Sequence, residues 1–164
     1  MELIDVYDIN RKKLNYTKVR GTLDNNEYNI ASELWLINNH KLLITKRAIN
    51  KSHPNEWEVP GGCSIINENT LDTLIREIKE EINISLNKDD CIFIDTYIYK
   101  NQFLDIYKST YLINKDLIKL QLEEVSEYKF VTEEEFINMN NDHLIVESVF
   151  NRYKIIKDKI TQDW

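Results

Sequence analysis

Three glutamates, Glu77, Glu80 and Glu81, lie close together in the stretch GCSIINENTLDTLIREIKEEINI, which covers residues 62–84. Carboxylates three or four residues apart on a helix repel each other, at a cost of about a few tenths of a kcal/mol per pair. A divalent cation would offset this cost, because carboxylate oxygens are the ligands that Mg²⁺ and Mn²⁺ prefer and both ions also bind phosphate oxygens. Taken alone, the cluster is more often a solvated acidic face, with Arg76 and Glu80 as an ordinary ion pair.

A helix is predicted to position these carboxylates. Asn69 is a suitable N-cap, and Asp72 three residues later completes a variant of the capping box. Apolar residues at helical spacing follow it: Leu71, Leu74, Ile75, Ile78 and Ile82. This apolar stripe predicts a helix that buries one face and presents the glutamates on another.

Segments rich in β-branched and aromatic residues are predicted strands on both sides of this helix. They are ELIDVY, NIASELWLI and KLLITKR before it, and CIFIDTYIY, FLDIYKSTYLI and VSEYKFV after it. INNHK is a predicted hairpin turn, and EWEV is a short extended piece before the break at residues 60–62, Pro-Gly-Gly. Two more helices are predicted, one near EEEFINM and one from about Asp142 to Lys159. This order predicts an α/β fold with a mixed β-sheet between helices.

Length and charge limit the classes of function. The chain of 164 residues is 42% hydrophobic and 30% charged, which suits a single domain over residues 1–164. Its formal net charge of −7 argues against general nucleic-acid or anionic-membrane binding, because both need a basic surface. Cys63 and Cys91 form no CxxC pair and the acidic start does not resemble a signal peptide, so we expect a cytoplasmic protein. No stretch approaches the length of a membrane span.

The glutamate stretch as a whole resembles the signature of the Nudix hydrolases, G(x)5E(x)7REU(x)EE(x)GU, in which U is a large aliphatic residue. Its positions are occupied by Gly62, Glu68, Arg76-Glu77-Ile78, Glu80-Glu81 and Ile84. Asn83 stands where the family has Gly. Asn is the next most tolerant residue of left-handed backbone, so we expect a slightly less stable helix end and an intact site. The segments WEVPGG and VSEYKFVTEEEF are also similar to the family.

This resemblance implies a Nudix-type α/β/α sandwich and a role for each matching residue. The implied ligands of Mg²⁺, with Mn²⁺ as the alternative ion, are Gly61 through its carbonyl oxygen, Glu77, Glu80 and Glu81. Arg76 and Glu68 are expected to pair and to orient these glutamates for catalysis. The implied reaction is hydrolysis of a phosphoanhydride bond in a nucleoside diphosphate linked to another moiety, or in a related organic pyrophosphate.

The general base and the substrate contacts differ among members of the family. Glu77 is our first candidate for a metal ligand that also serves as base, and the loop residues Glu123 and Glu124 are alternatives, although loop glutamates are usually solvent-exposed. Arg47, at the end of KLLITKR, is a candidate either to bind substrate phosphate or to pair with an acid of the signature. Trp57 is a candidate to stack on a nucleobase, although a Trp beside the core more often packs.

Other functions remain as alternatives. The N-terminal half is similar to isopentenyl-diphosphate isomerases, but their catalytic Cys aligns with Gly62, one of their His ligands aligns with Asn29, and they lack this full set of glutamates. A non-catalytic nucleotide-binding Nudix domain would typically have lost some of the glutamates. A coenzyme A pyrophosphatase is disfavoured, because Ser52 and Glu56 stand where it has a basic residue and Gly. We expect a small-molecule nucleotide or diphosphate as partner, and the terminal helix and N-terminal strand as candidate contacts of a homodimer.

Overall fold

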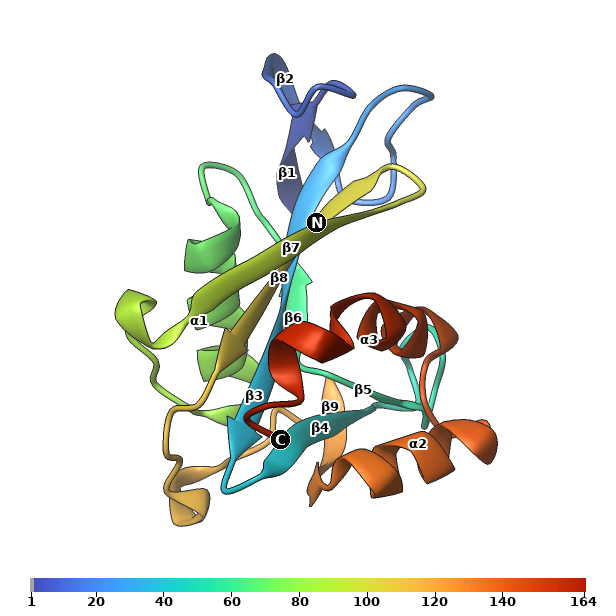
Figure 1. Ribbon diagram of the computed structural model, residues 1–164. Coiled ribbons are helices and arrows are strands. Elements are labelled where there is room, and N and C mark those ends of the chain that lie inside the picture. Colours follow the sequence, from blue (N-terminus) through green and yellow to red (C-terminus); the bar gives the residue numbers. More distant parts are fainter. Residues whose placement is uncertain (1) are drawn as a thin grey trace.

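The computed structural model describes residues 2–164 and shows a mixed β-sheet with helices on both sides (Figure 1). Its elements in chain order are β1 (Leu3–Tyr7), β2 (Lys13–Val19), β3 (Asn29–Asn38), β4 (Lys41–Arg47), β5 (Trp57–Glu58), β6 (Gly61–Cys63), α1 (Thr70–Ile82), β7 (Ile92–Tyr99), β8 (Gln102–Ser109), β9 (Val125–Val131), α2 (Glu133–Asn141) and α3 (Glu147–Ile160). Each predicted strand and helix is present. Within residues 2–164, no helix is both long enough and apolar enough to cross a membrane.

Strand β3 lies at the centre of the main sheet. It runs parallel to β8 and antiparallel to β4 and β6. The strand order is β5-β4-β3-β8-β7, with β6 paired to β3 and β9 paired to β4. All 10 residues of β3 are buried, as expected for a strand that is covered on both faces. The hairpin between β3 and β4 turns through Asn39 and His40, whose φ angles of 50° and 60° suit the predicted tight turn.

The layer between the sheet and α1 is mainly aliphatic. Leu34 and Leu36 of β3 pack there with Leu74, Ile78 and Ile82 of α1, and all five side chains are fully buried. Burying a side chain of this size contributes about 1.5–3 kcal/mol. The three helix residues belong to the predicted apolar stripe, so this packing fixes which face of α1 remains free for the glutamates.

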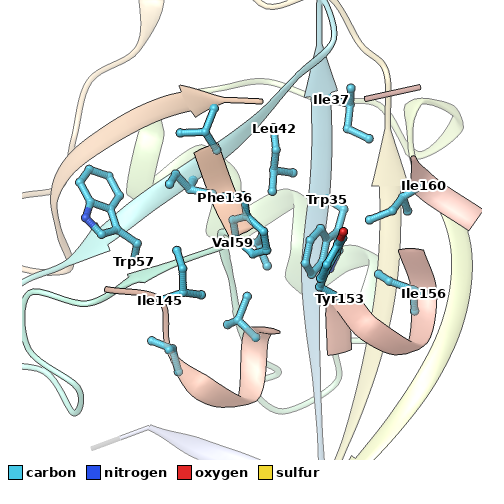
Figure 2. Packing of buried hydrophobic residues seen from close by; sticks show 14 of the residues in the cluster. Trp35, Ile37, Leu42, Trp57, Val59, Phe136, Ile145, Tyr153, Ile156 and Ile160 are labelled. Carbon is cyan, nitrogen blue, oxygen red and sulfur yellow. The ribbon is translucent and has the colours of Figure 1, made fainter. Parts of the chain in front are cut away.

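The layer on the opposite side of the sheet is rich in aromatic rings (Figure 2). The ring centroid of Trp35 in β3 lies 5.9 Å from that of Phe136 in α2 and 6.3 Å from that of Tyr153 in α3. Successive residues of β3 point to opposite faces, so Trp35 faces this layer while its neighbours face α1. The two layers confirm the predicted sheet between helices, with α1 on one side and α2 and α3 on the other.

Three parts of the structure differ from the prediction. The sequence does not predict β2, because most of its residues are exposed and carry no apolar alternation. Strand β6 occupies the predicted break after Pro60 and pairs with β3. Helix α3 begins at Glu147 rather than near Asp142. The residues just before Glu147 are extended rather than helical, because Ile145 forms a β-bridge with Trp57.

Strands β1 and β2 form a separate antiparallel hairpin, drawn at the top of Figure 1. β1 packs against β3, and Ile4 and Val6 of β1 are buried. Arg11, between the two strands, donates to both carboxylate oxygens of Asp105 in β8 at 2.8 and 2.5 Å. The backbone nitrogen of Asn67 donates to Asp5 of β1 at 2.8 Å. The hairpin is therefore fixed both to the main sheet and to the loop that leads into α1.

Candidate active site

A polar cavity of about 510 Å³ lies beside the central strand. It is lined by the four predicted metal ligands, Gly61, Glu77, Glu80 and Glu81, and also by Arg47, Arg76 and Glu124. Its walls come from α1, β6, β3, the start of α3, the loop after β4 and the N-terminal hairpin. Segments from the whole length of the chain thus meet at the glutamates.

Helix α1 positions the glutamates, and both of its ends are held by side chains. At the start, Asn69 accepts from the backbone nitrogen of Asp72 at 2.9 Å, as predicted. The Asp72 carboxylate accepts from the Asn69 side chain rather than from its backbone, so the capping box is only half formed. At the other end, Asn83 has the expected left-handed backbone, with a φ of 59°. Its side chain donates to the carbonyl oxygen of Leu117 at 2.9 Å, which joins the helix end to a distant loop.

Arg76 connects the carboxylates of the site. Its Nε and Nη2 donate to the two oxygens of Glu68 at 2.6 and 2.9 Å, so the predicted pair is present. Its Nη1 donates to Glu77 at 3.0 Å and to Glu80 at 3.1 Å. Burial opposes ionisation of Glu68, but hydrogen bonds from Arg76 and Thr73 outweigh it and hold the pKa of Glu68 below its ordinary value. Arg76 therefore remains charged beside Glu77 and limits where that carboxylate can point.

Two adjacent glycines allow the close packing around Glu77. A Cβ atom on Gly62 would lie 2.3 Å from Cδ of Glu77, and one on Gly61 would lie 2.2 Å from the carbonyl oxygen of Ser32. Both distances are far below a normal non-bonded contact, so larger residues at these positions would push β6 away from β3 or from α1. Gly61 thus lets β6 pass directly beside β3, and Gly62 lets it pass directly beside Glu77.

Negative charge accumulates around Glu81. Burial and the nearby carboxylates of Glu77, Glu58 and Glu124 raise the pKa of Glu81 to about 9, and Lys51 offsets this only in part. Burial likewise raises the pKa of Glu77 and of Glu58 above the ordinary value. A divalent cation would stabilise the ionised forms and reverse these shifts.

The donor atoms of this cluster suit a hard divalent cation. Glu77, Glu80, Glu81 and the carbonyl oxygen of Gly61 offer the oxygen ligands that Mg²⁺ and Mn²⁺ prefer. Within residues 2–164, however, no three acidic, His or Cys side chains are already gathered as a metal-binding group. One oxygen of Glu77 and one of Glu80 bind Arg76 instead, so a cation would have to share these carboxylates with Arg76 or displace it.

The predicted substrate residues have partners within the protein. Nη1 of Arg47 donates to both oxygens of Glu58 at 2.6 and 2.7 Å, so Arg47 pairs with an acid of β5 rather than with one of the signature. Glu124 forms an ion pair with Lys51 on the cavity wall. Trp57 does not line the cavity; it is 3% exposed and packs in the aromatic layer of Figure 2. The structure therefore contradicts the expectation that Trp57 stacks on a nucleobase. Alternation along β5 turns Glu58 toward the cavity and Trp57 into the core.

Several charged residues of the cavity were not singled out from the sequence. Glu33 of β3 and Arg152 of α3 form a buried pair with N–O distances of 2.6 to 2.9 Å. Charged residues are seldom fully buried without a partner, so an acid inside the apolar segment NIASELWLI was an available signal. Arg20 and Glu2 reach the cavity from the N-terminal hairpin, and no local pattern indicates this.

Known proteins of one family match this chain. Residues 28–152 match the sequence profile of the NUDIX domain. The protein belongs to the Nudix family. A Nudix hydrolase from Listeria monocytogenes is 30% identical over 139 residues, which cover 82% of each chain. A Nudix hydrolase from Listeria innocua is 29% identical over 138 residues, with the same coverage of each chain. The protein is therefore a Nudix hydrolase, of the class that cleaves pyrophosphate linkages.

Solved structures of low sequence identity share its fold. DR0079 from Deinococcus radiodurans superposes with a TM-score of 0.72 at 18% identity, covering 88% of this Nudix chain and 92% of that chain. The MutT protein from Methanosarcina mazei Go1 gives a TM-score of 0.64 at 20% identity, covering 80% and 94%. A bifunctional NMN adenylyltransferase/ADP ribose pyrophosphatase from Francisella tularensis, solved with AMP and a Mn ion, gives 0.62 at 16% identity, covering 80% and 42%. Nudix hydrolases generally use divalent metal ions.

Proposed function

We propose that this Nudix hydrolase cleaves a phosphoanhydride bond in a nucleoside diphosphate linked to another moiety, or in a related organic pyrophosphate, with Mg²⁺ as its metal ion and Mn²⁺ as an alternative. The whole chain, residues 1–164, forms the catalytic domain in this proposal. The observation that carries it is the accumulation of Glu77, Glu80 and Glu81 at one cavity beside Arg76. Arg76 brings one positive charge to these three carboxylates and Glu68, and the remaining negative charge suits a divalent metal ion that also binds phosphate.

Glu77, Glu80, Glu81 and the carbonyl oxygen of Gly61 would hold the cation. When bound, such an ion neutralises negative charge on the phosphoryl oxygens as the bond to the leaving group breaks. The protein supplies the position of the carboxylates, because Arg76 is itself held by two hydrogen bonds to Glu68. Loss of either partner of this pair would leave Glu77 free to adopt other rotamers.

A carboxylate of the cavity would accept a proton from the attacking water. We assign this role to Glu77, because it lines the cavity and its hydrogen bond from Arg76 holds its carboxylate beside the other glutamates. Glu124 also lines the cavity, but its ion pair with Lys51 would have to open first. Glu123 does not line the cavity, which makes it the weaker of the two loop candidates.

The size and polarity of the cavity support a substrate of nucleotide size. A volume of about 510 Å³ lies within the range of pockets that bind small organic molecules. Arg47 and Lys51 on its wall would attract phosphate groups while they stay paired with Glu58 and Glu124. The Francisella tularensis relative is an ADP ribose pyrophosphatase solved with AMP, which makes ADP-ribose a suitable first compound to test.

The proposal is tested with a panel of compounds. The panel contains ADP-ribose, dinucleoside polyphosphates, nucleotide sugars, normal and oxidised nucleoside triphosphates, coenzyme A and isopentenyl diphosphate, each incubated with Mg²⁺ or with EDTA. We expect Mg²⁺-dependent release of a nucleoside monophosphate from at least one nucleoside-diphosphate-linked compound. Cleavage of none of them, or isomerisation of isopentenyl diphosphate, would contradict the proposal.

A further inference from the structure

Two residues that line the active-site cavity precede the region that matches the NUDIX profile. The match begins at residue 28, whereas Glu2 and Arg20 belong to the N-terminal hairpin region. The hairpin thus adds one positive and one negative charge to the cavity. Neither residue has a role in the mechanism proposed above.

The position of Arg20 is fixed by the hairpin. It directly follows β2, and its backbone nitrogen donates to the carbonyl oxygen of Glu2 at 2.9 Å. Gly21, with a φ of 88°, then turns the chain away, a conformation that favours glycine. On the other strand, the carbonyl oxygen of Leu3 accepts from the backbone nitrogen of Ile66, in the loop before α1, at 3.1 Å. Arg20 is therefore held beside the segment that carries the glutamates.

Most of the basic side chains that line the cavity are held by a close partner. Arg76 binds three glutamates, and Arg152 and Arg47 each bind both oxygens of one glutamate. Lys51 is paired with Glu124, and both side chains are mostly buried, at 29% and 33% exposure. These four residues are therefore costly to detach from their partners.

Arg20 is held much more loosely. It pairs with Glu2 through Nη1 at 2.9 Å, and the two side chains are 46% and 55% exposed. An ion pair this exposed contributes little to stability, so an anion in the cavity can replace Glu2 at low cost. Arg20 also lies close enough to Glu77 to be among the charges that act on that carboxylate. Arg20 thus lines the same cavity as the glutamates of the proposed reaction.

We propose that Arg20 binds the phosphate groups of the substrate, and that the substrate displaces Glu2 from it. This inference rests on the proposed function, because it concerns the same cavity. A guanidinium matches the geometry of phosphate oxygens and can donate two parallel hydrogen bonds to them. The ligand is therefore a diphosphate ester or another anion with adjacent phosphate groups, and the hairpin contributes directly to its affinity.

Binding of inorganic diphosphate in the presence of Mg²⁺, followed by isothermal titration calorimetry, tests this role without requiring turnover. Arg20→Ala should weaken the affinity by about tenfold or more, because a charge-assisted contact is lost. Arg20→Lys should keep part of it, since Lys retains the charge but not the paired donors. Lys12→Ala is the matched control, because it removes an exposed positive charge from the same hairpin outside the cavity.

Glu2→Gln gives a result of the opposite sign. Removing the competing carboxylate should tighten diphosphate binding by about twofold to fivefold, which no purely structural role of the hairpin predicts.

Unchanged affinity in both Arg20→Ala and Glu2→Gln, equal losses in Arg20→Ala and Lys12→Ala, or no diphosphate binding by the wild type would overturn the inference. Failure of the substrate panel together with Arg20-dependent diphosphate binding would refute only the proposed reaction. Hydrolysis that is insensitive to Arg20→Ala, with diphosphate affinity unchanged, would refute only the role of Arg20.

Discussion

Asp105 in β8 and Glu81 in α1 are two acids of the same fold, and the protein surrounds them with opposite kinds of neighbour. Asp105 is 4% exposed and accepts hydrogen bonds from Arg11, Thr70 and Thr96 at 2.5 to 2.8 Å. Glu81 is half-buried among other acids, and within residues 2–164 the structure shows no hydrogen bond to its carboxylate. One carboxylate is satisfied by donors and the other is not.

The two surroundings shift the two pKa values in opposite directions. Burial opposes ionisation of Asp105, but hydrogen bonds from Arg11, Thr70 and Thr96 outweigh it and lower its pKa. Burial and neighbouring acids raise the pKa of Glu81 to about 9. Buried polar groups that serve the fold are usually fully bonded, whereas a strongly perturbed acid in a cavity is typical of a functional site. The comparison shows that Asp105 joins the hairpin to the sheet, and it supports the proposal that Glu81 binds the cation.

The largest effect is expected from Glu81→Gln, which keeps the shape of the side chain and removes its charge. Mg²⁺-dependent turnover of the best panel substrate should fall by about a hundredfold or more, because a metal ligand is lost. Glu134→Gln is the control, since Glu134 is an exposed acid of the same type in α2 that does not line the cavity. Near-full turnover by the Glu81 variant would remove the basis for assigning Glu81 to the metal.

Asp105→Asn should instead weaken the fold. Arg11 would lose its charged partner, and we expect a loss of about 1–3 kcal/mol in the free energy of unfolding at neutral pH. Urea denaturation measures this loss, and turnover per folded molecule should stay close to that of the wild type. A large loss of turnover with unchanged stability would mean that Asp105 serves the site and that the comparison is wrong.

The pH dependence of stability should differ in sign between the two acids when EDTA removes metal ions. The folded-state pKa of Asp105 is lowered, so its stabilising contribution is present above its unfolded pKa of about 3.9 and is lost as pH falls through the folded value. The folded-state pKa of Glu81 is raised, so its cost appears above an unfolded pKa of about 4.3 and grows toward about pH 9. Near pH 7, the thermal unfolding midpoint of Asp105→Asn should therefore lie below that of the wild type. The midpoint of Glu81→Gln should lie above it. Both differences should shrink toward about pH 3. The same sign for both variants near neutral pH would contradict the assignment.

The smallest effects are expected at Asn83, where α1 ends. Asn83→Ala should lower stability by about 1 kcal/mol, because Ala tolerates the φ of 59° poorly and cannot bond to Leu117. Asn83→Gly relieves the backbone but loses the same bond, so its stability should stay within about 0.5 kcal/mol of the wild type. Thermal unfolding and turnover are measured for both variants. If Asn83→Ala is as stable as Asn83→Gly, the left-handed backbone at residue 83 does not affect the stability of the protein.

Local patterns predicted α1 and the order of most strands. Five apolar residues at helical spacing and a cap at Asn69 are short-range signals, and the buried face of α1 fixes which side carries the glutamates. The substitution of Asn83 for Gly was also interpretable from backbone preferences alone. The grouping of Glu77, Glu80 and Glu81 followed from their spacing, because neighbouring turns of a helix place them together.

Long-range contacts could not be predicted in the same way. The pair of Glu33 and Arg152 joins residues 119 positions apart in the chain, and the approach of Arg20 to the cavity depends on how the hairpin docks. The direction of Trp57 was ambiguous because β5 has only two residues, too few to show which face is buried. Strand β2 lacked a signal because it is exposed on most of its length.

Binding of Mn²⁺ is the most direct test of the central claim that Glu77, Glu80 and Glu81 form a metal site. Electron paramagnetic resonance measures free Mn²⁺ during a titration of the wild type, Glu81→Gln and the control Glu134→Gln, whose changed residue is exposed and outside the cavity. We predict a site in the wild type and in the control, and a loss of affinity of about tenfold or more in Glu81→Gln. Equal Mn²⁺ affinity in all three proteins would contradict the account, because Glu81 would then not be a ligand of the metal ion.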